Sequence, residues 1–502
     1  METNLAEFGV TKSGNRFEKS VGKHVCMYVR AVSDENTSGG PSVSKVYNVA
    51  ALKENDLCKK CTCDLENNLI DCTNKLNSWL SNEEWNVLIN GNFTFETIKL
   101  EHNNLSSIPI LPTYDVKHLY IGYNQIDSIA NGAFQNLSDL TSLDLSHNKL
   151  TSKVLLPDVF KGPYTVSDYK ALYNLKSLNL GYNELHFLDA DLFEHAPNLE
   201  ELILCSNNFQ VIDGLSEVAI SGLTSLKVLD ISYMEIKTLP QTLLHGPRDL
   251  ETLIAAGNLF SKLPDALSFA RNLARLVLNE NPIEDLQGDN IFPVMTNLRY
   301  LSMSYMPKLR HIGVGAMSEL QNLTELILSD NKFLVEIDEL ALAKNLTDGQ
   351  YMNYPPLEKV YLNNCNLTKL PKSLLVRWDK LSVLDLRYNP WTCEESNDYL
   401  INILLPQINK TTALLAKNVK CDSPVELKNV DILKVATDHL IDSKKSSGIF
   451  WIGLLVFILI AIPITLGIIV LYRRGCFSLN RNDSGASRAL YNRTKFNDDY
   501  QI

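Results

Sequence analysis

Cysteine is the residue type in this chain whose spacing most clearly indicates chemistry. Four of the ten cysteines lie within fifteen residues of one another, namely Cys58, Cys61, Cys63 and Cys72. Two more, Cys393 and Cys421, bracket a later segment. Cysteines at such spacings either bind zinc or form disulfides. The C-x-x-C-x-C run lacks a second pair of ligands at a spacing suited to zinc, so disulfides are the favoured interpretation.

The other reactive residues show no catalytic pattern. The sequence has no G-x-G-x-x-G after a predicted strand, no G-x-x-x-x-G-K-[ST], no H-E-x-x-H and no G-x-S-x-G. Its net charge is −11, from 47 Lys and Arg against 58 Asp and Glu, so the chain as a whole does not attract nucleic-acid phosphates. We therefore expect no enzyme, no cofactor, no metal site and no nucleic-acid partner.

A repeat supplies the elements that would position the functional residues. The 502 residues include 80 Leu and 48 Asn, and from residue 95 the pattern L-x-x-L-x-L-x-x-N-x-L recurs. Twelve copies can be placed, beginning at Phe95, Val116, Leu140, Leu175, Leu199, Leu226, Leu250, Leu273, Leu298, Leu323, Leu357 and Leu381. Nine of the eleven intervals between them fall in the range of about 20–29 residues.

The periods within one copy predict its local structure. The L-x-L core alternates with period 2, which predicts a short strand with its leucines on one face, and stacked copies then form a parallel sheet. The Asn turns the chain, and its side-chain amide can bond turn backbone groups that no neighbouring strand reaches. Met234, Met306 and Cys365 replace it in three copies, where we expect the hydrogen-bond ladder to be interrupted.

This pattern resembles the leucine-rich repeat family. The resemblance implies an α/β-type solenoid with a parallel β-sheet on its concave face and a cap at each end. Residues 58–72 resemble the N-terminal cysteine cap of extracellular members, which implies the pairs Cys58–Cys63 and Cys61–Cys72. The run from Asn389 to Cys393 resembles the start of the C-terminal cap, which implies one bridge between Cys393 and Cys421. Four cysteines remain unassigned: Cys26, Cys205, Cys365 and Cys476.

One segment has the composition of a membrane anchor. Residues 448–472 contain no charged side chain, and a helix of this length, at ~1.5 Å per residue, spans the ~30 Å hydrocarbon layer. The following 30 residues carry six Arg and Lys against three Asp, so the positive-inside rule places this tail in the cytoplasm. The first 57 residues show no secretory signal. Either the natural start lies elsewhere, or the helix inserts late as a tail anchor and leaves the rest of the chain in the cytosol.

We therefore divide the chain into seven segments. They are 1–57, unassigned and without a clear signal peptide; 58–94, the N-terminal cysteine cap; 95–390, about twelve repeats; 391–440, the C-terminal cysteine cap; 441–448, a juxtamembrane linker; 449–472, the C-terminal transmembrane helix; and 473–502, the cytoplasmic tail. A disulfide-bonded ectodomain in an oxidising compartment could be glycosylated, and the candidate sites are Asn36, Asn92, Asn104, Asn136, Asn322, Asn345, Asn366 and Asn409.

Two columns of residues are the candidate ligand-binding surface. The residue between the leucines of L-x-L faces away from the core, and its aromatic and larger aliphatic members are Tyr120, Ile203, Ile254, Val277, Ile327 and Tyr361. We expect them to form an exposed apolar stripe. The residue directly before the Asn position is His or Tyr in seven copies, namely His102, Tyr123, His147, Tyr182, Tyr233, Tyr305 and Tyr388, and tyrosine suits recognition because it has few torsions to restrict. Both columns could instead only satisfy β-propensity or pack on one another.

As a whole, residues 58–472 resemble single-pass leucine-rich repeat proteins of the insect cell surface, related to Toll ectodomains, connectin and capricious. The resemblance implies a type I plasma-membrane receptor that recognises a protein ligand or an opposing cell-surface protein. Alternatives are an innate-immune co-receptor that signals through a partner, and a tail-anchored scaffold facing the cytosol. At the tail, Tyr500 and Ile502 have the spacing of a PDZ-type ligand, which predicts a cytoplasmic scaffold partner.

Overall fold

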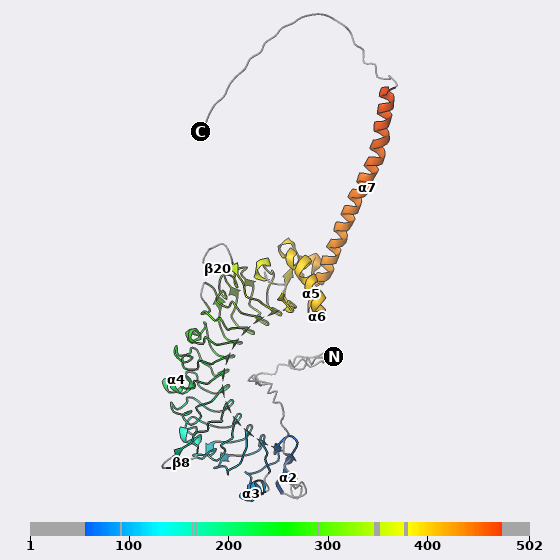
Figure 1. The fold of residues 1–502 in the computed structure, drawn as a ribbon. Coiled ribbons are helices and arrows are strands. Elements are labelled where there is room, and N and C mark those ends of the chain that lie inside the picture. Colours follow the sequence, from blue (N-terminus) through cyan, green and yellow to red (C-terminus); the bar gives the residue numbers. More distant parts are fainter. Residues whose placement is uncertain are drawn as a thin grey trace, which may run out of the picture. The chain divides into compact units, whose positions relative to one another are not determined.

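The computed structural model describes residues 56–473, apart from 91–92, 163, 166–167, 289–290, 346–351 and 376–379. The chain separates into two compact units, residues 1–435 and 436–502. In the described part of the first unit, the repeats form a curved stack with their long sheet along its inner side (Figure 1).

Fourteen strands make up this sheet, in the order β1-β2-β3-β5-β7-β10-β11-β12-β13-β14-β16-β18-β22-β23. The twelve repeat strands are β3 (Thr97–Lys99), β5 (His118–Tyr120), β7 (Ser142–Asp144), β10 (Ser177–Asn179), β11 (Glu201–Ile203), β12 (Val228–Asp230), β13 (Thr252–Ile254), β14 (Arg275–Val277), β16 (Tyr300–Ser302), β18 (Glu325–Ile327), β22 (Lys359–Tyr361) and β23 (Val383–Asp385). Each begins two residues after its predicted repeat start and pairs in parallel with the next. The predicted parallel sheet of about twelve repeats is therefore confirmed.

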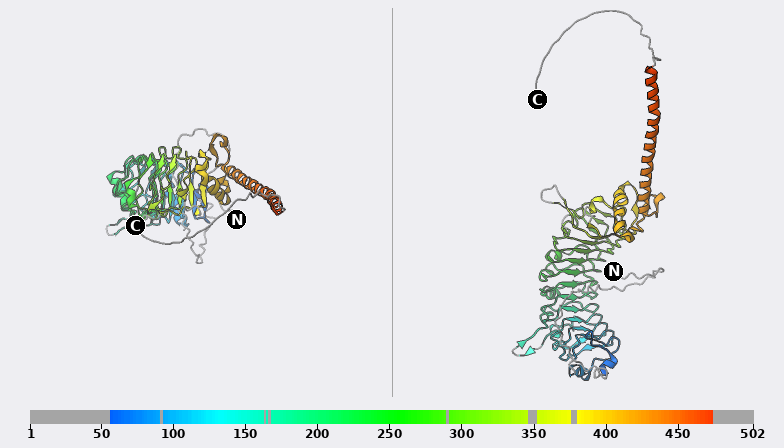
Figure 2. Two further views of the ribbon diagram at one scale, coloured as in Figure 1. Left: turned by 90° about the horizontal axis from the view of Figure 1, so that it is seen from above. Right: turned by 45° about the vertical axis from the view of Figure 1, so that its right-hand side comes forward.

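Shorter elements return the chain between the strands. On the outer side lie β4 (Ser107–Ile108), β6 (Ser128–Ile129), β15 (Asp285–Leu286), β17 (His311–Ile312), β19 (Glu336–Ile337), helix α4 (Gly214–Ser221) and the 3-10 helices η1 (Pro157–Val159), η2 (Asp265–Phe269) and η3 (Lys372–Leu375). The two longest repeats each add an antiparallel pair, β8 (Tyr164–Thr165) with β9 (Asp168–Tyr169) and β20 (Lys344–Asn345) with β21 (Met352–Asn353). The first of these pairs projects from the stack (Figure 2).

The core lies between the sheet and these return segments. The repeat leucines are buried, and phenylalanines fill the outer half of the stack, where Phe134, Phe160, Phe260 and Phe292 are fully buried. Each buried leucine or phenylalanine side chain contributes about 1.5–3 kcal/mol relative to an exposed one. A single repeat has no second layer of its own, so this burial requires neighbours on both sides.

Buried asparagines join successive repeats. In each repeat that keeps the Asn, its Nδ2 donates to a carbonyl of its own turn and, in most, to the equivalent carbonyl of the preceding repeat. Asn281 Nδ2, for example, lies 3.0 Å from both Leu278 O and Ala255 O, and its Oδ1 accepts the Phe260 N–H at 3.1 Å. The asparagines therefore form a continuous spine wherever consecutive repeats contain them.

The spine is interrupted where the sequence predicts. An asparagine in place of Met234 would donate a hydrogen bond to Leu204 O of the preceding repeat, and one in place of Met306 would donate to Leu278 O. Methionine has no donor, so these bonds are not made. Cys365 differs, because its Sγ lies 3.1 Å from Leu328 O and so replaces one of the two amide bonds. The interruption is complete at the two methionines and partial at the cysteine.

Disulfides close both ends of the stack. The N-terminal cap contains α2 (Asp56–Lys60), β1 (Thr62–Asp64), β2 (Leu69–Asp71) and α3 (Asn82–Asn90). The C-terminal cap contains β24 (Trp391–Thr392), η5 (Glu395–Asn397), the π-helix η6 (Leu400–Leu404), α5 (Leu405–Thr411), α6 (Ala413–Ala416), β25 (Cys421–Ser423) and η7 (Val425–Leu427). The disulfides are those that the family resemblance implies: Cys58–Cys63, Cys61–Cys72 and Cys393–Cys421.

The last helix, α7, extends over Ile432–Arg473 and includes residues 441–448, which the sequence predicted as a linker. Among the residues described here, no helix combines the length and apolar character needed to cross a membrane. The transmembrane helix predicted at 449–472 is therefore not confirmed.

Candidate functional site

The last residue of each repeat strand belongs to a column along the sheet, which we call the inner column. Because the strands pair in register, its members lie about 4.8 Å apart. The predicted exposed apolar stripe is wrong for the centre of this column, where Ile203, Ile254 and Val277 expose only 5%, 2% and 1% of their surface. The other predicted members, Tyr120, Ile327 and Tyr361, are half-buried and accessible.

Packing between neighbouring columns explains the burial of Ile254 and Val277. Ile254 and Val277 form a cluster with Ala256, and Tyr300 packs against it. The Arg275 guanidinium lies 3.5 Å from the centre of the Tyr300 ring, a distance at which cation and ring attract. A concave sheet brings side chains closer together than a flat one, so medium-sized residues between two other columns lose contact with water.

The residues before the spine position form a second column, here called the edge column. Its twelve members are His102, Tyr123, His147, Tyr182, Ser206, Tyr233, Gly257, Glu280, Tyr305, Asp330, Asn364 and Tyr388. All have a positive φ, between 53° and 62°. This left-handed conformation costs a non-glycine residue about 1–2 kcal/mol. The side chains therefore leave the sheet in a fixed direction, which repeats from rung to rung.

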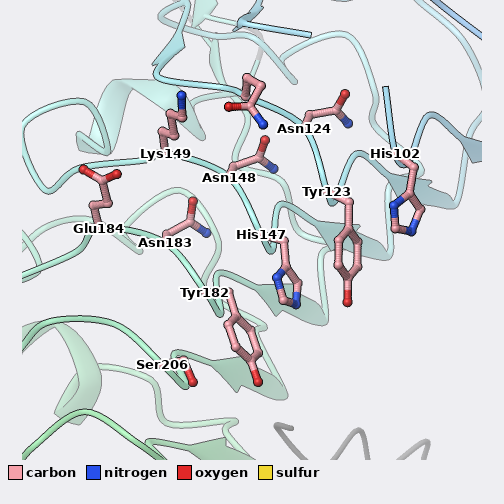
Figure 3. A pocket seen from close by; sticks show the side chains of 11 residues that line it. His102, Tyr123, Asn124, His147, Asn148, Lys149, Tyr182, Asn183, Glu184 and Ser206 are labelled. Carbon is pink, nitrogen blue, oxygen red and sulfur yellow. The ribbon is translucent and has the colours of Figure 1, made fainter. Parts of the chain in front are cut away.

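Four rings of the edge column stack on one another (Figure 3). The ring centres of His102 and Tyr123 lie 4.2 Å apart, and those of Tyr123–His147 and His147–Tyr182 lie 3.9 Å apart in each case. The planes are inclined by only 13–19°. Burial and then the charge of His102 lower the pKa of His147, so this imidazole tends to stay neutral. The four rings form a rigid ladder with their edges towards solvent.

An open hollow of about 590 Å³ borders the ladder. Spine asparagines, including Asn148 and Asn183, form its floor, and Lys149 and Glu184 lie on its rim. In the described part of the chain, no group of His, Cys, Asp or Glu is placed to hold a metal ion.

The edge column continues in a different form after Ser206. The Tyr233 hydroxyl donates to Glu280 Oε1 at 2.7 Å, across the intervening repeat. Gly257 makes this possible, because a Cβ there would approach the Tyr233 ring to 2.1 Å. Burial, and then the bond to Glu280, raise the pKa of Tyr233. Further along, Tyr305 and Tyr388 expose 58% and 65% of their surface.

Acidic members of the inner column are buried. Asp230 is 1% exposed, and burial raises its pKa to about 6. Its Oδ1 accepts two bonds from Ser232, from the N–H at 2.9 Å and the hydroxyl at 2.6 Å, but its Oδ2 has no hydrogen-bond donor among the described residues. Asp385, at the C-terminal end, is instead held by Arg387 at 2.6 and 2.8 Å.

The remaining predicted sites are scattered over the surface or lie outside the described residues. Among the candidate glycosylation sites, Asn104, Asn322, Asn345 and Asn366 are exposed, whereas Asn136 and Asn409 are half-buried. Asn36, Asn92, Tyr500 and Ile502 lie outside the described residues. The free thiol of Cys365 is buried, and burial raises its pKa to about 12.

The chain belongs to the leucine-rich repeat family. The family model described as "Leucine rich repeat" matches residues 94–150, 114–162, 169–209, 197–260 and 271–333. The chain is 30% identical to lumican of Mus musculus over 290 residues, which are 57% of this chain and 77% of lumican. With the cap disulfides, this supports an extracellular type of leucine-rich repeat protein; the insect subtype is not confirmed.

Two further similarities cover less of the proteins concerned. The chain is 26% identical to CD180 antigen of Mus musculus over 360 residues, which are 71% of this chain and 46% of CD180 antigen. A solved structure of the Toll–Spatzle complex, from Drosophila, matches 58% of this chain and 36% of its own, with 22% identity and a TM-score of 0.44.

Proposed function

We propose that this chain is a cell-surface recognition receptor that binds a protein partner through the edge column. The observation that carries the proposal is the stack from His102 to Tyr182. Its rings are already ordered by their left-handed backbone and by each other. A partner that contacts them therefore avoids much of the cost of about 0.5–1.5 kcal/mol for restricting each flexible side chain.

The chemistry of the stack favours a protein over a small molecule. The faces of His147 and Tyr123 are covered by neighbouring rings, so the exposed edges present alternating hydroxyl and imidazole groups that can donate or accept. The bordering hollow is open rather than enclosed, whereas small-molecule sites usually bury most of their ligand. Exposed Tyr305 and Tyr388 extend the same column and would enlarge the contact.

Two modes of action fit such a surface. Adhesion to an opposing cell-surface protein is the one that we propose, and capture of a ligand for a signalling co-receptor is the alternative. The three cap disulfides favour both over a scaffold facing the cytosol, because disulfides persist in oxidising compartments.

We further propose that residues 449–472 anchor the chain in the plasma membrane as a single span with residues 473–502 in the cytoplasm. The support is the absence of charge from 448–472 and the exposure of apolar side chains from Leu454 to Ile469 on α7. The basic tail sets the orientation. We also propose that Tyr500 and Ile502 bind a PDZ-type scaffold, for which the spacing of the two residues is the support.

The receptor proposal can be tested on full-length chain displayed on cultured cells. The probe is an array of secreted and cell-surface ectodomains, and cells displaying the wild-type chain should bind at least one. For that ectodomain, Tyr123→Ala and Tyr182→Ala should each weaken binding about 10-fold or more, as truncation of a central aromatic residue does.

Tyr173→Ala is the matched control. Tyr173 is 54% exposed, against 44% for Tyr123, and is not part of the edge column. It should leave binding unchanged at equal surface display. If the two edge variants bind as tightly as wild type, the recognition site lies elsewhere and the proposal fails.

A further inference from the structure

An arginine on the concave face of the sheet lacks the counter-ion that an arginine usually has. Arg275 is the first residue of β14, and its guanidinium lies over the ring of Tyr300 on the neighbouring strand, 3.5 Å from the ring centre. The residue is half-buried, and no described residue forms an ion pair with it. Its Nε is buried without an acceptor among the described residues. A buried N–H group without an acceptor destabilises the folded state, so stability alone does not account for an arginine here.

Basic residues elsewhere on the same margin of the sheet are paired. Lys117, Lys176 and Lys227 each stand directly before a repeat strand, and the Nζ of each lies within 3.0 Å of a glutamate oxygen at the same position of an adjacent repeat. Lys359, the first residue of β22, pairs with Glu325 of β18 at 3.2 Å. The margin therefore neutralises its own positive charge both before and after the repeat that contains Arg275.

Arg299 adds a second unpaired cation beside Arg275. It directly precedes Tyr300, is exposed, and its side chain makes no hydrogen bond or ion pair with a described residue. A charge at this position acts on the first residue of the strand that follows. In the second repeat, burial lowers the pKa of His118, and the charge of Lys117 directly before it lowers this pKa further. The charge of Arg299 therefore acts at the place of Tyr300, over which the Arg275 guanidinium lies.

We propose that Arg275 and Arg299 form a carboxylate-binding site that takes an acidic side chain of a protein partner. A guanidinium is a planar fork that matches the two oxygens of a carboxylate, and stacking on Tyr300 already fixes its plane. The site lies on the margin where the strands begin, whereas the edge column follows their ends. The inference rests on the proposed protein-binding function and adds to it the position and the chemistry of a second contact.

The surroundings favour an acidic protein segment over a sulfated polysaccharide. Tyr300 packs against the buried apolar cluster around Ile254, and arginine and tyrosine beside apolar surface are typical of the centre of protein interfaces. A sulfated polysaccharide is instead bound by longer runs of basic residues. On this margin, exposed Asp249 and Glu251 interrupt the positive charge one repeat before Arg275, and the net charge of the whole chain is −11.

Peptide selection on the full-length chain tests the site without a known partner. A random peptide library displayed on phage is selected for binding to cells that carry the wild-type chain, and peptides that also bind the Arg275→Gln, Arg299→Gln double variant are removed. The retained peptides should share an Asp or Glu at one aligned position. Each should bind the double variant at least about 10-fold more weakly than wild type, as expected when a central arginine contact is lost.

Replacement of the shared Asp by Asn, or of the shared Glu by Gln, should abolish the preference of a peptide for the wild-type chain. If no peptide distinguishes wild type from the double variant, the proposal fails. It also fails if the retained peptides share no acidic residue, or if the amide peptides keep the preference, because the arginines would then not be reading a carboxylate.

Arg310→Gln is the matched control. Arg310 is exposed and lies over an aromatic ring, that of Phe333 at 5.8 Å, but it belongs to a return segment, so the retained peptides should bind this variant as they bind wild type. Arg275→Lys keeps the charge and loses the fork, so it should still weaken binding. If Arg275→Gln lowers surface display, Arg299→Gln alone decides, because its exposed side chain has no structural contact to lose.

Labelled heparin is the probe for the other ligand class. Heparin that binds wild type and is lost from the double variant, with no acidic peptide retained, would assign the site to a sulfated polysaccharide and refute the proposal. The retained peptides should bind Tyr123→Ala and Tyr182→Ala as tightly as wild type. The carboxylate site and the edge column are therefore judged by different variants, and failure of one is distinguishable from failure of the other.

Discussion

Loss of one spine asparagine should destabilise several repeats at once. Asn281 is fully buried, and its Nδ2 lies within 3.0–3.2 Å of three carbonyl oxygens, those of Ala255, Leu278 and Asn279. Its Oδ1 also accepts the Phe260 N–H at 3.1 Å. Asn281→Ala removes all four contacts and leaves buried backbone groups without partners.

The size of this effect follows from the number of bonds. At about 1 kcal/mol per hydrogen bond, with a further penalty for buried groups left unsatisfied, the free energy of unfolding should fall by about 3–5 kcal/mol. The total stability of a domain is about 5–15 kcal/mol, so the loss is a large share of it. Urea denaturation of the full-length chain, followed by circular dichroism, measures the change.

Asn272→Ala is the matched control for this prediction. Asn272 is exposed, its Nδ2 donates to Arg248 O at 2.8 Å and its Oδ1 accepts from Asn297 Nδ2 at 3.2 Å. Water can replace both of these exposed bonds, so the loss of Asn272 should cost only about 0.5–1.5 kcal/mol. If Asn281→Ala destabilises the chain by no more than Asn272→Ala, the spine does not contribute as the hydrogen bonds indicate.

Two further predictions concern the inner column. Ile254→Asp should lower the denaturation midpoint sharply because it buries a charge, whereas Ile327→Asp, at a half-buried position, should leave the midpoint nearly unchanged; equal midpoints would show that Ile254 is accessible after all. Burial raises the pKa of Asp230 to about 6, so the folded state binds more protons than the unfolded state between about pH 4 and pH 6. The free energy of unfolding should therefore fall by up to about 3 kcal/mol as the pH rises through this interval. Asp230→Asn should remove this fall in urea titrations at successive pH values, and an unchanged pH profile would assign the fall to another group.

The repeat frame could be predicted from the sequence because it depends on local periods. The leucine spacing locates all twelve strands, and the replacements at Met234 and Met306 locate the breaks in the spine. The family resemblance supplied the cap disulfides. All of these features depend on contacts within one repeat, between adjacent repeats or within one cap.

Exposure on the concave face could not be predicted in the same way. Alternation shows that Ile254 points away from the core, but not that Tyr300 and Ala256 enclose it, since those residues come from other columns. The left-handed edge column was also missed as a backbone feature, although its tyrosines were singled out. The available signal was the recurrence of His or Tyr directly before the spine position. The spine Asn lies at a tight turn, so the residue before it could have been expected to adopt an unusual backbone conformation.

The two methionines in the spine have a mechanical consequence. They divide the repeats into blocks of five, three and four, within which amide bonds, or the Cys365 thiol in the last block, link successive turns. In the proposed adhesion role, a partner on another cell would place the chain under tension. The turns beside Met234 and Met306 lack these cross-links, so a pulled chain should yield there first, and each block would remain wound while the joints between them extend.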